Sequence, residues 1–106
     1  MIGSDFPVET YLKVVGAAIY QHTIPYGALP GSRRVWGRDL YRIAEYELAH
    51  KRPPLTVIVV HKQDGRPGEG GAIVMAQAGY TAKPGESADD VWKRVLAAVF
   101  TYWKPS

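Results

Sequence analysis

Apolar residues recur at the three- and four-residue spacing of an α-helix in two early stretches of the sequence. The first covers residues 7–20. The second runs from about Gly37 to His50, where Pro53 and Pro54 stop it because proline cannot continue a helix. The positions that repeat at this spacing are Val8, Leu12, Val15 and Ile19 in the first stretch and Leu40, Ile43, Ala44 and Leu48 in the second. The pattern predicts two amphipathic helices, each with an apolar face.

A third helix is expected over residues 88–102. Ser87 followed by Asp90 matches a capping box, and the carboxylates of Asp89 and Asp90 suit the positive end of the helix dipole. Its apolar positions form a wide stripe, from which Trp92 and Tyr102 are excluded: Val91, Val95, Leu96, Val99, Phe100 and Trp103. We expect this stripe to close the core.

Residues 55–60, LTVIVV, form a short apolar run rich in β-branched side chains, which is typical of a buried strand. A polar, glycine-rich loop follows over residues 61–71, with Asp64 and Gly65 as a tight-turn pair. Residues 72–78 fit a returning strand or a short helix, and their alanines and methionine favour the helix. The sequence therefore predicts an α+β fold, a small and mainly helical domain with a short strand or hairpin, similar to a winged helix.

Length and composition narrow the class of protein. With 106 residues, of which 46% are apolar, a single domain over residues 1–106 is expected. The chain has no cysteine, which excludes disulfides, thiolate metal sites and cysteine nucleophiles. The first residues lack the basic and then apolar pattern of a signal peptide, and no apolar run is long enough to cross a membrane. We expect a cytoplasmic protein with no membrane partner.

Positive charge is concentrated in the middle of the chain. Residues 33–66 hold eight basic and four acidic residues, a net charge of +4, whereas the remainder nets −1. A basic patch is the electrostatic footprint of phosphate binding, although ordinary protein surfaces carry such patches too. The charge distribution therefore favours a phosphate-bearing partner without requiring one.

Histidine and carboxylate patterns give little support for catalysis. His22, His50 and His61 are far apart and show no metal-site spacing, so no metal site is predicted. Glu45 and Glu47 are two residues apart, and on a helix such side chains point about 200° apart rather than converging. We expect both glutamates to be solvated or paired with Arg42 and Lys51.

Two weaker arrangements stay open. Glu45 or Glu47 with Lys62 and Asp64 imitates the acidic and lysine set of a small metal-dependent nuclease. The glycines of loop 61–71 invite comparison with phosphate-binding loops, but neither the GK[ST] nor the GxGxxG spacing is present. We predict no cofactor, and the sequence favours a non-enzymatic role while leaving an enzymatic one open.

A nucleic-acid-binding module with a winged-helix-like layout accounts for the basic residues best, with DNA as the expected partner. A helix that exposes a basic stripe fits the major groove, while neighbouring loops contact phosphates. The residues assigned to this interface are Arg33 and Arg34 ahead of the second helix, Arg38 and Arg42 on it, and Lys62 and Arg66 on the following loop.

Residues 24–71 resemble the DNA-binding domain of alkyltransferases and alkyltransferase-like proteins. Tyr26-Gly27 would match the YG turn of that family, Arg34 its intercalating arginine, Gly37 the start of its recognition helix, and Asp64-Gly65 its wing turn. The family's catalytic PCHR segment is missing, so the resemblance implies a DNA-binding fold without alkyl transfer. The segments RPPLTVIVV, GRPGEG and VFTYW also look like those of small bacterial proteins, a likeness that implies no function.

The aromatic content supports a rival function. Three tryptophans and seven tyrosines are many for this length, and such residues are enriched at protein interfaces. Trp36, between Arg34 and Arg38, is the best candidate for an exposed one, with packing against the second helix as the alternative. A protein-interaction module or inhibitor, from a host, a phage or a mobile element, therefore stays open, as does a homodimer.

Overall fold

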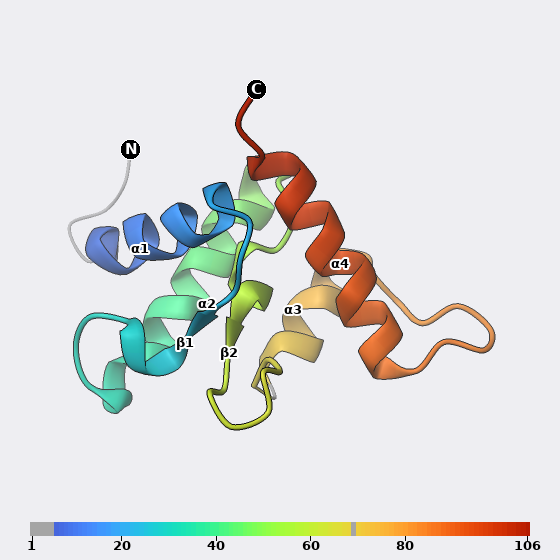
Figure 1. Cartoon of the computed structure of the whole chain (residues 1–106), viewed down its shortest axis with the longest axis horizontal. Coiled ribbons are helices and arrows are strands. Elements are labelled where there is room, and N and C mark those ends of the chain that lie inside the picture. The colour runs from blue at the N-terminus through green and yellow to red at the C-terminus, as the bar shows by residue number, and fades with distance from the viewer. Residues whose placement is uncertain (1–5, 69) are drawn as a thin grey trace.

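Four α-helices, two short strands and two 3₁₀ turns form the part of the chain that this computed structural model describes, residues 6–68 and 70–106 (Figure 1). In chain order they are α1 (Val8–Ile19), β1 (Ile24–Pro25), η1 (Tyr26–Ala28), α2 (Arg33–Ala49), η2 (Leu55–Ile58), β2 (Val59–Val60), α3 (Gly70–Gln77) and α4 (Ala88–Trp103). The predicted α+β class and its mainly helical character are confirmed.

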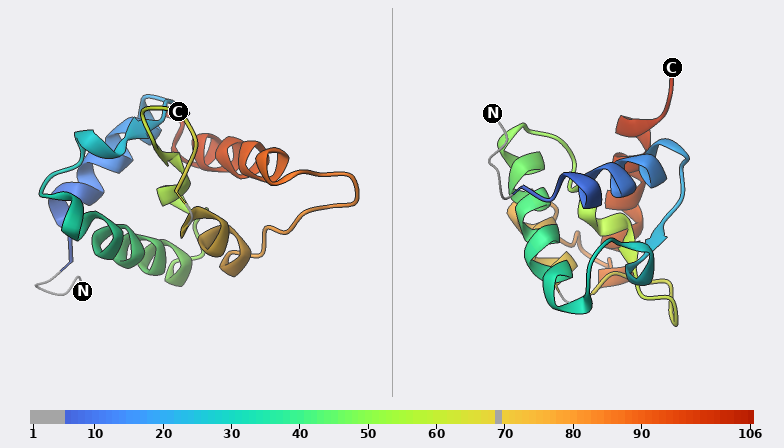
Figure 2. Two further views of the ribbon diagram at one scale, coloured as in Figure 1. Left: turned by 90° about the horizontal axis from the view of Figure 1, so that it is seen from below. Right: turned by 90° about the vertical axis from the view of Figure 1, so that its left-hand side faces the viewer.

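The hydrophobic core is organised around η2. Leu55, Val57 and Ile58 of this turn have no exposed surface, and all four helices contact it. Figure 2 (left) shows η2 between α1 and α4 on one side and α2 and α3 on the other. Trp92 of α4 also donates its indole N–H to the Val57 carbonyl oxygen at 2.9 Å. Because apolar burial is the dominant favourable term in folding, this one segment holds the helices together.

The strand expected over residues 55–60 is wrong for most of its length. Residues 55–58 form η2, and only Val59 and Val60 are extended as β2. β2 pairs in parallel with β1, with Ile24 opposite Val59. A continuous apolar run suits any segment that is buried on all sides, so the pattern identified the burial of residues 55–60 and not their backbone conformation.

The described residues contain no strand that returns antiparallel to β2, so the hairpin form of the expectation is wrong. Residues 61–66 turn tightly at Gly65, whose φ of 67° lies in the left-handed region that favours glycine. The Asp64 carboxylate accepts the Arg66 backbone N–H at 3.0 Å and completes this turn. The chain then enters α3, which confirms the preference for a helix over residues 72–78 up to Gln77.

The helices predicted from periodicity are confirmed with one change of boundary. α2 begins at Arg33, one turn earlier than the expected start at Gly37. Trp36 lies in this added turn and packs against the core, so tertiary packing extends the helix beyond the periodic pattern. α1 and α4 agree with the predicted ranges to within one residue.

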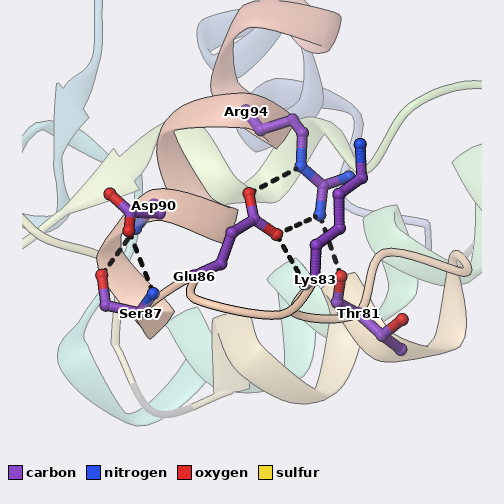
Figure 3. Close-up of polar contacts among 6 residues, drawn as sticks. All are labelled: Thr81, Lys83, Glu86, Ser87, Asp90 and Arg94. Carbon is purple, nitrogen blue, oxygen red and sulfur yellow. Dashed lines mark hydrogen bonds and ion pairs between the residues drawn. The ribbon is translucent and has the colours of Figure 1, made fainter.

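The segment between α3 and α4 is held by polar contacts near the start of α4 (Figure 3). The predicted capping box is present, since Ser87 and Asp90 exchange hydrogen bonds of 3.0 and 3.2 Å. Arg94 donates to Glu86 at 3.0 Å and to the Thr81 carbonyl oxygen at 2.9 Å. The hydrogen bond from Arg94, followed by that from the Lys83 backbone N–H, lowers the pKa of Glu86, so this carboxylate stays charged to a lower pH than an unpaired glutamate.

The buried face of α1 differs from the apolar positions that the spacing singled out. Val8, Leu12 and Ile19 are 48%, 63% and 38% exposed. The buried residues of α1 are instead Thr10, Val14, Ala17 and Ala18. α1 is apolar on two sides, and its small residues allow the closer approach to η2 and α4. Periodicity alone does not choose between two such faces.

Glu47 is fully buried, which corrects the expectation that it is solvated or paired with Lys51. Its Oε2 accepts hydrogen bonds from Arg52 Nε at 2.7 Å and from the Tyr11 hydroxyl at 3.3 Å. The Arg52 guanidinium also lies over the Tyr46 ring, 5.1 Å from its centroid. These four residues, the Glu47 cluster, join the C-terminal end of α2 to α1.

Removal of Arg52 tests how much the Glu47 cluster stabilises the fold. Arg52→Ala leaves a buried carboxylate unpaired, and we expect the free energy of unfolding to fall by about 3 kcal/mol, as measured by urea denaturation. The double variant Glu47→Leu, Arg52→Met removes both charges and should recover most of this loss. A loss below about 1 kcal/mol for Arg52→Ala would show that the buried charge does not need its partner.

Tyr11 gives this cluster a pH dependence. Burial and the charge of Glu47 raise the pKa of Tyr11 from 10.0 to about 12. Below pH 10 the hydroxyl is protonated in both the folded and the unfolded chain, but between the two values only the unfolded chain releases the proton. Stability should therefore fall as the pH rises from about 10 towards about 12. Denaturation across this window should show a smaller fall for Tyr11→Phe, and an equal fall in both proteins would contradict the assignment.

Candidate nucleic-acid interface

The N-terminus of α2 carries positive charge and has no side-chain cap. Ser32 is the N-cap residue, yet its hydroxyl makes no capping hydrogen bond. The first turn contains no acidic residue and begins with Arg33 and Arg34, both exposed. Cations at this position oppose the helix dipole and the unpaired N–H groups of the first turn. The arrangement costs stability in the free protein and favours an anion at this end of the helix.

The N-terminus of α4 shows the opposite arrangement of charge and capping. Its first turn carries Asp89 and Asp90, and its capping box satisfies the N-terminal groups. The chain therefore has one helix start, in α4, that its own side chains neutralise, and another, in α2, that has no side-chain cap and carries two arginines.

Aromatic rings bring loop 61–66 to the start of α2. The Tyr26 ring lies 4.9 Å from the His61 ring and 6.1 Å from the Trp36 ring, measured between centroids. The parallel pairing of β1 and β2 explains this proximity, because η1 and the loop both leave the same edge of the sheet. Gly68 lies against Tyr26, since a Cβ at this position would be 2.7 Å from the Tyr26 hydroxyl oxygen.

The six basic residues assigned from the sequence lie in different surroundings. Arg33 and Arg34 lie at the start of α2, and Lys62 is exposed on the loop that Tyr26 and His61 hold nearby. Arg38 is 67% exposed and lies 3.7 Å from Asp39, in a shallow depression that it shares with the start of α1.

The remaining two residues of the six are more restricted. Arg42 is half-buried, two turns after Arg34. Arg66 turns towards α4, where its Nε lies 3.6 Å from Asp89 Oδ1. The structure thus brings Arg33, Arg34 and Lys62 towards one end of the molecule, with Arg38 and Arg42 continuing along α2.

Trp36 is half-buried against the core and Tyr26 rather than openly exposed. Its indole nitrogen is buried and has no hydrogen-bond partner in the described part of the structure. The more exposed aromatic residues are Tyr20, Tyr41 and Tyr102, at 78%, 55% and 51%. The packing alternative for Trp36 therefore describes its environment better.

A cavity of about 300 Å³ lies between α2 and α3, next to Tyr26. Its lining is mostly apolar and includes Leu40, Tyr41, Ile73 and Val74. The sequence analysis did not find this cavity. Four glycines, at positions 37, 68, 70 and 71, lie in its wall, but glycine positions alone do not show which segments meet.

The carboxylates and histidines considered for catalysis lie in separate places. These residues contain no group of three or more histidine and carboxylate side chains that could hold a metal ion. Of the carboxylates considered for a nuclease, Glu47 is engaged with Arg52, and Asp64 accepts a backbone hydrogen bond in an exposed turn. His50 contacts the Tyr46 carbonyl oxygen at 2.8 Å, at the C-terminal end of α2.

Comparisons with protein-family models, curated proteins and solved structures gave no match to this chain. The functional argument therefore rests on the chain's own geometry. Within residues 6–68 and 70–106, no helix has the length and apolar character needed to cross a membrane.

An exchange of charge at the start of α2 tests the anion site. Ser32→Asp with Arg33→Glu supplies a cap and a favourable dipole partner, so we expect stability to rise by about 0.5–1 kcal/mol in thermal unfolding. The same variant should lose the stabilisation that millimolar tripolyphosphate gives to the wild type. Lys104→Glu, a charge change beyond α4, is the control and should keep that stabilisation. Equal stabilisation of all three proteins would exclude the start of α2 as the binding position.

Proposed function

We propose that this protein is a non-enzymatic nucleic-acid-binding module whose partner is DNA. The observation that carries the proposal is the uncapped, arginine-bearing start of α2. The backbone N–H groups of the first turn and the guanidinium groups of Arg33 and Arg34 are all hydrogen-bond donors. They suit the acceptor oxygens of a phosphate group, but they cannot satisfy one another.

The surroundings of this helix start support an extended contact. Arg34, Arg38 and Arg42 are four residues apart and therefore follow one side of α2, with a rise of about 6 Å between neighbours. Lys62 provides a second point of phosphate contact from the loop beside Tyr26. An α-helix fits the major groove of DNA, so α2 enters the groove while its start and the loop hold the backbone.

A role in protein interaction is the second candidate function. It is favoured by the apolar surface that α2 and α3 expose, with Tyr41, Leu48 and Ile73 more than 40% exposed. None of these three residues is among the proposed phosphate contacts, so a protein-binding role is compatible with DNA binding.

Fluorescence anisotropy with labelled double-stranded DNA across a salt series tests the proposal. Binding should weaken linearly in log salt, and Arg33→Ala with Arg34→Ala should reduce the slope by about 1–2 through loss of phosphate contacts. Arg38→Ala with Arg42→Ala should weaken binding as well. The matched control is Lys13→Ala with Lys104→Ala, which removes two exposed charges outside these elements and should leave the slope unchanged.

Two results would oppose the proposal. Absence of micromolar binding at low salt would exclude a nucleic-acid role. Equal slopes for the wild type and the Arg33, Arg34 variant would exclude the start of α2 as the phosphate contact. Single-stranded DNA and RNA of the same sequence, measured in parallel, show whether double-stranded DNA is preferred.

A further inference from the structure

The cavity beside Tyr26 has a buried floor and an open mouth. Leu40 and Thr56, each 9% exposed, line its floor. Tyr41 and Ile73, which are 55% and 63% exposed, line its mouth. Voids in a packed protein interior rarely exceed the size of a water molecule, whereas about 300 Å³ is the lower end of the range for small-molecule sites. The cavity therefore has the size of a site for a small organic molecule that enters between α2 and α3.

The hydroxyl of Thr56 is a polar group without a partner at this floor. It makes no hydrogen bond with any other group of residues 6–68 and 70–106. Thr56 is buried, yet its Oγ1 is not among the unpartnered atoms that are sealed from solvent, and the cavity is the opening that this residue lines. An unpaired hydroxyl in such a place costs free energy. A ligand with a hydrogen-bonding group at its inner end would satisfy it.

The side chains that line the cavity define the chemistry of its ligand. None of the described lining residues is charged, and Leu40, Pro67 and Val74 give the wall an apolar character. Burial of an ionised group without an opposite charge is costly, so this lining favours an uncharged ligand. The rings of Tyr26 and Tyr41, from two different elements, also lie in the wall. Because aromatic rings pack favourably against one another, an aromatic ligand suits the cavity best.

Gly37 leaves the mouth of the cavity open. It lies inside α2, three and four residues before Leu40 and Tyr41, and therefore on the same side of the helix. Neither the backbone nor the packing requires glycine at this position, because its φ is not positive and a Cβ would meet no neighbouring atom within 4 Å. Glycine destabilises the interior of a helix relative to alanine. Gly37 thus lowers the stability of α2 and keeps a side chain away from the mouth.

We propose that the cavity between α2 and α3 binds a small, uncharged aromatic molecule whose hydrogen-bonding group meets the Thr56 hydroxyl at the floor. The rings of Tyr26 and Tyr41 pack against this ligand, and the absence of a side chain at Gly37 admits it. The proposal does not depend on DNA binding, because none of the residues assigned to phosphate contact lines the cavity.

Indole tests the cavity directly, since it is aromatic and uncharged and has a single N–H donor. In an NMR titration of the full chain, we expect saturable shifts of the amide signals of the four glycines in the wall, at positions 37, 68, 70 and 71, and none at Gly16 in α1. The dissociation constant should be on the order of 1 mM or below, as suits so small a ligand. Indole-3-carboxylate should bind in the cavity about tenfold more weakly or worse, because its charge finds no partner there.

Two variants test the floor and the mouth separately. Thr56→Val should weaken indole binding by about three- to tenfold, because the indole N–H is then unpaired, and should not weaken binding of indene, which has no N–H. Gly37→Leu should weaken indole binding by about tenfold or more, because leucine covers the mouth. Gly16→Leu is the matched control, since Gly16 also lies inside a helix and a Cβ there would meet no neighbouring atom within 4 Å. It should bind indole like the wild type, and circular dichroism should show that all three variants are folded.

Three outcomes would overturn the inference. The first is the absence of saturable shifts with indole, or shifts that do not centre on the four glycines of the wall. The second is equal binding of indole and indole-3-carboxylate in the cavity, which would contradict the preference for an uncharged ligand. The third is an equal effect of Thr56→Val on indole and indene, or equal losses in Gly37→Leu and Gly16→Leu.

Discussion

Residues 55–59 are buried at the centre of the molecule, and the positions of the other elements follow from that burial. Each of the four helices contacts η2, so the helices are arranged around a segment rather than against a sheet. The chain leaves this centre through β2, whose pairing with β1 brings η1 and loop 61–66 to the same edge. The start of α2 and the loop are neighbours for this reason, although nearly thirty residues separate Arg33 from Lys62.

The sequence was most informative where a local rule decides the structure. The capping box of Ser87 and Asp90 depends only on residues three apart, and the start of α4 was predicted correctly from it. Residues 55–60 show the opposite case, because β-branched residues suit a strand, yet most of this buried run forms a 3₁₀ turn. The burial of Glu47 depends on Arg52 and on Tyr11, which lies 36 residues away, and no local pattern contains that information.

The candidate interface could be predicted in part for the same reason. The basic residues of α2 are a property of one continuous segment, and the sequence identified them as a group. Arg66 was grouped with them because it lies near Lys62 in the chain, but the tight turn at Gly65 directs it to Asp89 of α4. The cavity between α2 and α3 was missed altogether, because it is bounded by two segments whose relative placement depends on packing around η2.

α2 is held very differently at its two ends. The Glu47 cluster fixes the last turns to α1, whereas the first turn has no side-chain cap and two arginines that oppose the dipole. Local opening of a helix requires least free energy where such anchoring is weakest. We therefore expect amide protection to be higher in the last turns of α2, which the Glu47 cluster holds to α1, than in its uncapped first turn. In the proposed role, a phosphate bound at this end would supply the cap that Ser32 does not, so that binding would also complete the first turn of the helix.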